Sequence, residues 1–317
     1  MIMKNRRSFI IGIKSKTLST KEKKFIQKHK PWGIILFSRN IKSLKQTKQL
    51  TDQIKIIFKD KNYPILIDQE GGRVNRLRNF FNSDNLTSEF FGKLYIKDKK
   101  KFNLLYSIFT NKNALMLKIL GININTVPVL DLRVKGASKI INDRSFSNNV
   151  KLVSKIGDIC IDNYLKDKIA TVIKHIPGHG HAKVDSHKLT PTINIKYKQL
   201  ITKDFATFKN KKSLLAMTAH IIYKDIDPNN SATHSKKIIS LIRKNIKFKN
   251  LIMTDDISMK SLKHTIKENT KKSFKAGCNL VLHCNGKYNE MLDVAKNSPK
   301  LSNFIIKKTS QLYKILS

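Results

Sequence analysis

The chain of 317 residues is poor in cysteine, in acidic residues and in long apolar runs. Its three cysteines, Cys160, Cys278 and Cys284, show no zinc-like spacing, and an odd, small number argues against a disulfide framework and suits a reducing compartment. The apolar run near the basic N-terminus covers only residues 9–13, whereas a signal peptide needs about 7–15 apolar residues. No stretch approaches the roughly 20 apolar residues of a membrane span. We therefore expect a soluble, cytoplasmic protein with no membrane partner.

The shortage of acidic residues leaves a large positive charge. Only 22 aspartates and glutamates stand against 63 lysines and arginines, which gives a formal net charge of +41. Such a surplus can indicate nucleic-acid binding. The lysines, however, are spread along the whole chain, which favours a general drift of composition toward Lys, Ile and Asn with solvated lysine faces. Nucleic acid is kept as an alternative partner.

Short, β-branched apolar runs recur along the chain and predict strands buried on both faces, as in a parallel sheet. The eight runs cover residues 8–13, 32–38, 64–69, 124–132, 169–176, 214–222, 250–256 and 278–284. Between them lie segments with helical periodicity, at 43–58, 103–121, 150–165, 197–209, 235–246 and 266–277. This alternation predicts an α/β fold, a (β/α)₈ barrel of the TIM type, although a doubly wound open sheet gives the same local pattern. Because no repeat, linker or composition break divides the chain, we expect residues 1–317 to form one domain.

In a (β/α)₈ barrel the catalytic groups lie at the carboxyl ends of the strands. Polar residues of this sequence do lie at or near the carboxyl ends of several predicted strands. They are Asp68, Asp131, Lys174, His175, His220, Asp255 and Asp256. We therefore expect these side chains to gather at one rim of the barrel.

The loop "KHIPGHGHAKVDSHKL", residues 174–189, contains four of the nine histidines. A zinc site would prefer compact Cys/His spacing or a helix, and the proline and glycines at 177, 178 and 180 exclude the helix. A phosphate-binding loop would need Lys and Ser or Thr at the start of a helix, which is absent here. Asp185 and His187 are two residues apart, so the carboxylate can orient the imidazole and raise its pKa, as a proton donor requires. An ordinary surface turn explains the same pair equally well.

The adjacent acids Asp255 and Asp256 close a buried strand, where a carboxylate is costly unless something needs it. In an extended chain the two side chains point to opposite sides, so at most one faces the barrel mouth. We expect one of them to be catalytic and the other to cap the following helix.

Taken together, the motifs resemble those of the bacterial β-N-acetylglucosaminidases of glycoside hydrolase family 3, the single-domain cell-wall recycling type. The motifs, in order, are "LIDQEGGRVNRL" (66–77), "PVLDL" (128–132), "NDRSFS" (142–147), "KHIPGHG" (174–180), "DSH" (185–187), "MTAHIIY" (217–223) and "MTDDISM" (253–259). The resemblance extends from about residue 8 to about residue 290.

The resemblance implies a role for each matching residue. Asp255 would be the nucleophile, His187 the general acid/base, and Asp185 the residue that tunes His187. Further residues would bind the sugar hydroxyls and the N-acetyl group, namely Asp68, Arg76, Arg144, Lys174 and His175. Beyond the resemblance, we expect Asp131 to be a structural or supporting acid. His179 and His181 either line the loop or are polar turn residues, and we expect the second.

The resemblance also implies a retaining enzyme without metal or cofactor. The predicted protein is an exo-β-N-acetylglucosaminidase, a monomer that removes terminal N-acetylglucosamine from muropeptide fragments. A broader β-glycosidase and a glycoside phosphorylase of the same fold are alternatives, because a histidine acid/base would not repel phosphate as a carboxylate would. A basic nucleic-acid-binding barrel protein is the distant alternative.

Overall fold

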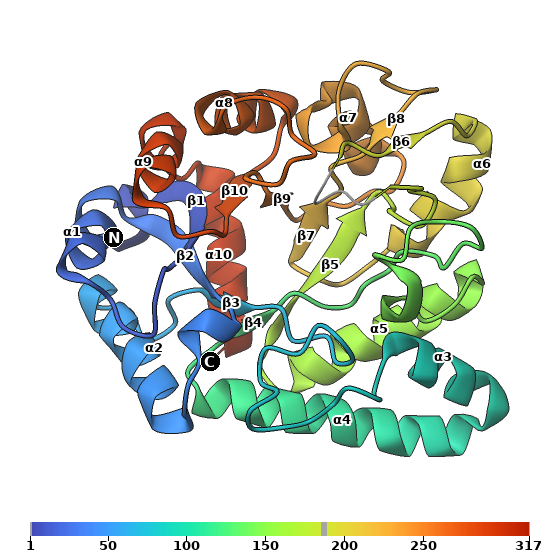
Figure 1. Cartoon of the computed structure of the whole chain (residues 1–317), viewed down its shortest axis with the longest axis horizontal. Helices are drawn as coiled ribbons and strands as arrows, with labels where there is room; N and C mark the ends of the chain where they lie inside the picture. The colour runs from blue at the N-terminus through green and yellow to red at the C-terminus, as the bar shows by residue number, and fades with distance from the viewer. Residues whose placement is uncertain (1, 185–188, 317) are drawn as a thin grey trace.

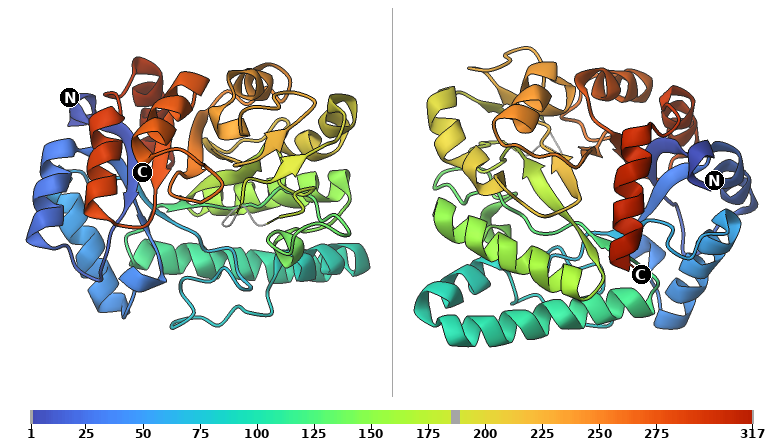
Figure 2. Two further views of the ribbon diagram at one scale, coloured as in Figure 1. Left: turned by 45° about the horizontal axis from the view of Figure 1, so that its top comes forward. Right: turned by 180° about the vertical axis from the view of Figure 1, so that it is seen from behind.

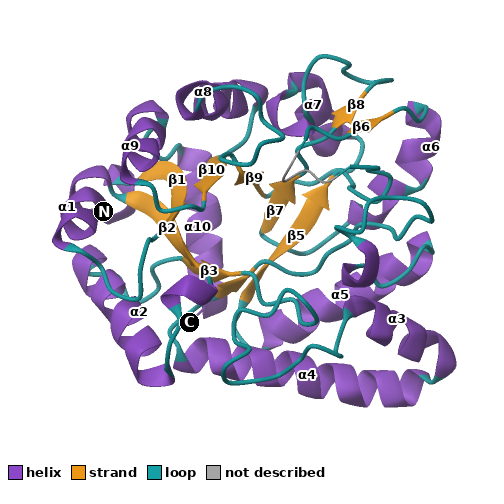
Figure 3. Ribbon diagram, in the orientation of Figure 1, coloured by secondary structure: helices purple, strands orange, loops and turns teal. Residues whose placement is uncertain are grey.

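Eight parallel strands close into a barrel in the computed structural model, which describes residues 2–184 and 189–316 (Figures 1 and 3). Around the barrel the order is β1-β10-β9-β7-β5-β4-β3-β2, so the first strand pairs with the last, for example Phe9 opposite Val281. The strands are β1 (Arg7–Gly12), β2 (Pro31–Leu36), β3 (Ile65–Ile67), β4 (Ile124–Asn125), β5 (Ala170–Ile176), β7 (Leu215–Thr218), β9 (Leu251–Asp256) and β10 (Leu280–His283). The predicted (β/α)₈ barrel is confirmed.

Helices surround the barrel on the outside (Figure 3). They are α1 (Thr20–His29), α2 (Leu44–Phe58), α3 (Ser88–Lys97), α4 (Lys99–Ile119), α5 (Val150–Lys166), α6 (Tyr197–Thr202), α7 (Lys236–Lys244), α8 (Ile266–Ala276), α9 (Tyr288–Asn297) and α10 (Asn303–Leu316). Side chains fix several of their starts: Ser19 with Glu22 and Thr265 with Glu268 form capping boxes at α1 and α8. No helix in the described ranges is long and apolar enough to cross a bilayer.

Three predicted elements differ from the structure by more than their end residues. The run 124–132 is a strand only at Ile124–Asn125, because Pro128 has no N–H to donate to a ladder; beyond it one bridge joins Val129 to Lys174. The run 214–222 ends as β7 at Thr218, and β8 (Ile222–Tyr223) pairs instead with β6 (Thr192–Ile193) in a separate small sheet. The predicted helix 197–209 divides into α6 and a 3₁₀ turn.

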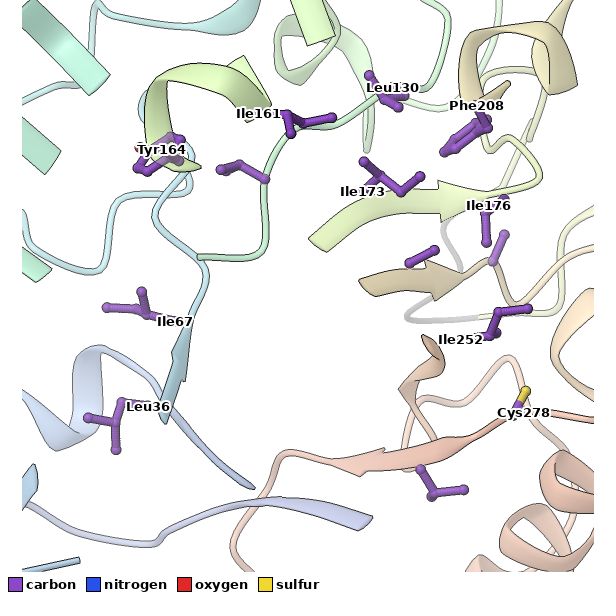
Figure 4. Packing of buried hydrophobic residues seen from close by; sticks show 14 of the residues in the cluster. Leu36, Ile67, Leu130, Ile161, Tyr164, Ile173, Ile176, Phe208, Ile252 and Cys278 are labelled. Atoms are coloured by element: carbon purple, nitrogen blue, oxygen red, sulfur yellow. The ribbon is translucent and has the colours of Figure 1, made fainter. Parts of the chain in front are cut away.

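The barrel wall separates two apolar layers, because alternate residues of a strand point to opposite faces. In β1, Phe9 and Ile11 belong to the outer layer between strands and helices, whereas Ile10 belongs to the inner layer. Figure 4 shows part of the outer layer, including Ile67 and Ile173. Filling of the barrel interior by side chains makes this fold a packed core instead of a pore.

The helix α10 covers the barrel at the amino ends of its strands, and the view from behind in Figure 2 shows it across the centre. Its Leu312 packs with the inner layer, and Thr309 accepts a hydrogen bond of 2.9 Å from the Trp32 indole at the start of β2. Arg6, just before β1, is 1% exposed and donates to Tyr313 of α10. This end of the barrel is therefore closed, which leaves the carboxyl ends of the strands for a site.

Candidate active site

A cavity of 420 Å³ lies at the carboxyl ends of the strands. The predicted site residues within the described ranges all line it: Asp68, Arg76, Arg144, Lys174, His175 and Asp255. They come from the ends of β3, β5 and β9 and from the loops that follow β3 and β4. The barrel topology thus brings together residues that lie up to 187 positions apart in the sequence.

Asp68, directly after β3, is surrounded by hydrogen-bond donors. Lys174 Nζ lies 3.1 Å from Asp68 Oδ1, and an Arg76 guanidinium nitrogen lies 3.5 Å from Oδ2. The Thr126 hydroxyl also donates to Asp68. Burial alone would raise the pKa of Asp68, but the charges of Lys174 and Arg76 lower it well below its ordinary value. Asp68 is therefore held as a carboxylate that can accept hydrogen bonds.

Glu70 is the site residue that sequence reasoning missed. Both of its oxygens accept from the Arg144 guanidinium at 2.8 Å, and Oε1 lies 2.6 Å from Lys174 Nζ. Its side chain is 4% exposed. Burial would raise the pKa of Glu70, but the charges of Arg144 and Lys174 lower it to about 2. Glu70 lies within the motif "LIDQEGGRVNRL", for which the resemblance implies roles only for Asp68 and Arg76.

Asp131 supports the site from beneath, as predicted for a structural or supporting acid. It is fully buried, and its Oδ2 lies 2.6 Å from His175 Nδ1. The same carboxylate accepts the backbone N–H of His175 at 3.2 Å and that of His179 at 2.7 Å. Burial would raise the pKa of Asp131, whereas the His175 charge lowers it. The carboxylate orients the His175 ring and fixes the base of the loop 176–184.

Asp255 and Asp256, at the end of β9, both line the cavity. The expectation that at most one faces the barrel mouth is wrong. In the pairing of β9 with β10, Met253 lies opposite Leu280 and Asp256 lies opposite Leu282. Three residues of β9 therefore match two of β10, and this extra residue in β9 interrupts the alternation of side chains. Burial would raise the pKa of Asp255, but the neighbouring His175 and the hydrogen bond from the Asp256 backbone N–H lower it.

The two neighbouring acids nevertheless have different surroundings. Asp256 Oδ1 accepts from Ser258 N at 3.0 Å and from Cys284 N at 3.1 Å, so this carboxylate caps a turn. It does not cap α8, whose N-cap is Thr265. Asp255 accepts a backbone N–H from Asp256 at 2.8 Å. Asp256 thus has the structural role expected for one of the pair.

His220 lies behind the two acids and is 1% exposed. Its Nε2 lies 3.0 Å from the Asp256 carbonyl oxygen, an acceptor, so Nε2 carries the proton. Its Nδ1 lies 2.7 Å from the Thr233 hydroxyl. Burial lowers the pKa of His220, which keeps this imidazole neutral near pH 7. His220 therefore holds the backbone that follows Asp255.

The predicted acid/base pair, Asp185 and His187, lies in 185–188, outside the described residues. The loop before it is well anchored, because Tyr223 donates to the Gly178 carbonyl and His181 Nδ1 lies 2.9 Å from Asp204. His179 is 3% exposed and lines the cavity, so the expectation of a mere turn residue is wrong for it. Within residues 2–184 and 189–316, no group of three His, Cys, Asp or Glu side chains is arranged to hold a metal ion.

Comparison with known proteins identifies the family. Residues 8–311 match the protein family described as "Glycosyl hydrolase family 3 N terminal domain". The chain belongs to glycosyl hydrolase family 3. A β-hexosaminidase of Haemophilus influenzae is 31% identical over 285 residues, 88% of this chain and 79% of the relative. A β-hexosaminidase of Actinobacillus pleuropneumoniae serotype 5b is 33% identical over 282 residues, 87% and 80% of the two chains.

Solved structures agree with this family 3 assignment. Native NagZ from Neisseria gonorrhoeae superimposes with a TM-score of 0.87 at 28% identity, covering 99% of this chain and 90% of that one. The same NagZ in complex with N-trifluoroacetyl-D-glucosamine gives a TM-score of 0.86 at 27% identity, with the same coverage. The enzyme class predicted from the sequence, a glycoside hydrolase of the β-N-acetylhexosaminidase type, is confirmed.

Proposed function

We propose that this enzyme is a retaining exo-β-N-acetylglucosaminidase. It removes the non-reducing terminal N-acetylglucosamine from peptidoglycan-derived muropeptides, in the cytoplasm and as a monomer, during cell-wall recycling. The observation that carries the proposal is that Asp255 lines one cavity with five side chains suited to sugar hydroxyls, and its lowered pKa favours the carboxylate form. A related protein, gonococcal NagZ, binds N-trifluoroacetyl-D-glucosamine, an N-acylated glucosamine.

Sugar binding falls to Asp68, Arg76, Arg144, Lys174 and His175. The ion pairs among these residues and with Glu70 hold the donors and acceptors in place before a sugar arrives. Prior orientation of this kind reduces the reorganisation that binding would otherwise require.

The chemistry proceeds in two displacements. The Asp255 carboxylate attacks the anomeric carbon and forms a glycosyl ester, while the bond to the leaving oxygen breaks and that oxygen takes a proton from His187. Water then attacks the same carbon, gives its proton to His187, and releases Asp255 as a carboxylate. Asp185 orients His187 and stabilises its protonated form. Each displacement inverts the configuration of the anomeric carbon, so the two together retain it.

Labelling with a 5-fluoro N-acetylglucosaminide, followed by peptide mass spectrometry, tests the nucleophile and the retention of configuration together. We expect a sugar ester on the peptide that contains Asp255, and none in an Asp255→Asn variant. Full activity of Asp255→Asn on an aryl N-acetyl-β-glucosaminide would contradict the assignment. Product analysis with added phosphate separates hydrolysis from phosphorolysis, because only the latter yields a sugar 1-phosphate. The rate of hydrolysis of an aryl β-glucoside, which has a hydroxyl in place of the N-acetylamino group, shows whether the enzyme is a broader β-glycosidase.

A further inference from the structure

Helix α4 carries a row of exposed aliphatic side chains that no other part of the described chain covers. Leu104, Ile108, Leu115 and Ile119 are 62%, 54%, 58% and 45% exposed. At 100° per residue the four fall within an arc of about 60°, and the row is about 22 Å long. Its opposite side packs into the core through buried residues such as Phe102. An exposed aliphatic side chain is ordinary when it stands alone, whereas an aligned row is a candidate interaction surface.

Lysines flank this row on both sides, and α4 contains no acidic residue. The helix carries Lys99, Lys100, Lys101, Lys112 and Lys118. On a helical projection Lys100 and Lys118 fall beside one edge of the row, and Lys101 and Lys112 fall at the other. None of the five forms an ion pair with any acidic side chain that the structure describes. Lys112 and Lys99 lie over the rings of Phe81 and Tyr95. Aliphatic residues bordered by lysines that lack an acidic partner are typical of helices that lie on anionic lipid surfaces.

The shape of the outer face of α4 also suits contact with a flat lipid surface. Figures 1 and 2 show α4 as a long, straight helix at the outer edge of the molecule. A ridge of this kind can insert its aliphatic side chains at the level of the lipid headgroups, while the flexible lysine stems carry their charges to the phosphates. The charge of +41 on the whole chain adds attraction at longer range. The same charge opposes pairing of two copies of this chain through the row.

We propose that the outer face of α4 docks this enzyme on anionic lipid bilayers. Docking of this kind requires no membrane span, so the lack of a long apolar helix in the described residues does not bear on it. None of the four aliphatic residues lines the active-site cavity. The proposal is therefore independent of the substrate and mechanism proposed above, and hydrolysis continues in solution.

Co-sedimentation with vesicles tests the docking surface. The probes are vesicles of phosphatidylcholine with phosphatidylglycerol, and vesicles of phosphatidylcholine alone. A row variant replaces Leu104, Ile108, Leu115 and Ile119 by glutamine, a good helix former that keeps the exposed positions helical. A matched control makes the same change at Ile56 and Ile96, which are 73% and 70% exposed on other helices. Hydrolysis of an aryl N-acetyl-β-glucosaminide in solution checks that each variant is folded.

We expect the parent protein to bind the phosphatidylglycerol vesicles and to bind phosphatidylcholine much less. The row variant should lose about tenfold or more of this affinity, since four aliphatic side chains no longer enter the lipid. The control variant should bind within about twofold of the parent. Equal binding by the row variant and the parent would overturn the proposal and leave charge alone as the cause. Failure of the parent to bind, or a dimer in solution that only the row variant abolishes, would overturn it as well.

Discussion

Glu70→Gln removes one buried negative charge between two buried positive ones, with almost no change of shape. The Glu70 pKa falls from 4.5 to about 2 in the folded protein, which corresponds to about 3 kcal/mol of stabilisation of the ionised form. Removing one partner of a buried ion pair costs about 3–5 kcal/mol, because the other charge stays behind without compensation. We therefore expect the free energy of unfolding at neutral pH to fall by about 3 kcal/mol.

The pH dependence gives this prediction its sign. Because the folded-state pKa is lowered, the contribution of Glu70 is fully present above pH 4.5 and is lost as the pH falls toward 2. Urea unfolding of parent and variant should therefore give a constant difference at neutral pH that shrinks below pH 4.5. Hydrolysis should suffer too, since Arg144 and Lys174 lose their common anchor; displacement of such groups by about 1 Å can cost on the order of 100-fold in kcat/KM.

Glu89→Gln is the matched control. This substitution makes the same chemical change at a side chain that is 25% exposed. Glu89 forms ion pairs with Lys93 and Arg133 at the surface. We expect it to cost less than about 1 kcal/mol and to leave kcat/KM unchanged. If Glu70→Gln and Glu89→Gln have the same effects on stability and turnover, the argument that Glu70 holds the sugar-binding cations is refuted.

Three further outcomes follow from other parts of the structure. Asp131→Asn places an amide N–H against backbone donors, so it should lower the free energy of unfolding by about 2–4 kcal/mol and slow hydrolysis; calorimetry and initial rates would detect this. Gly92→Ala would place Cβ 1.8 Å from the Phe146 carbonyl oxygen, and a drop of about 1–3 kcal/mol or more in urea unfolding is expected. If muropeptide carboxylates are attracted by the net charge of +41, rising ionic strength should lower the rate at low substrate concentration, and an unchanged rate would exclude that attraction.

The order of the barrel elements could be predicted from the sequence, because buried parallel strands have nearly continuous apolar sequences. The extra residue in β9 could not be, since it arises from the register between β9 and β10 and not from either segment alone. The expectation about Asp255 and Asp256 failed for that reason.

Polar networks were predictable only in part. Charged residues after strands locate the rim of the barrel, but a sequence does not show which of them meet. Glu70 was overlooked because its role depends on Arg144 and Lys174, 74 and 104 residues further along the chain. The position of His179 could not be predicted either, because its backbone N–H is held by the Asp131 carboxylate, 48 residues earlier in the chain, where this histidine lines the cavity.

The position of α10 has a consequence for the synthesis of this protein. A ribosome produces residues 7–283, which contain all eight barrel strands, before it produces residues 303–316. During that interval Trp32 lacks its partner Thr309, and the apolar side chains that Leu312 later covers face water. A growing chain with an uncovered apolar surface is prone to aggregate. The barrel therefore depends on a late-synthesised segment to complete its core. Early arrest of translation would leave an aggregation-prone intermediate instead of a smaller stable fold.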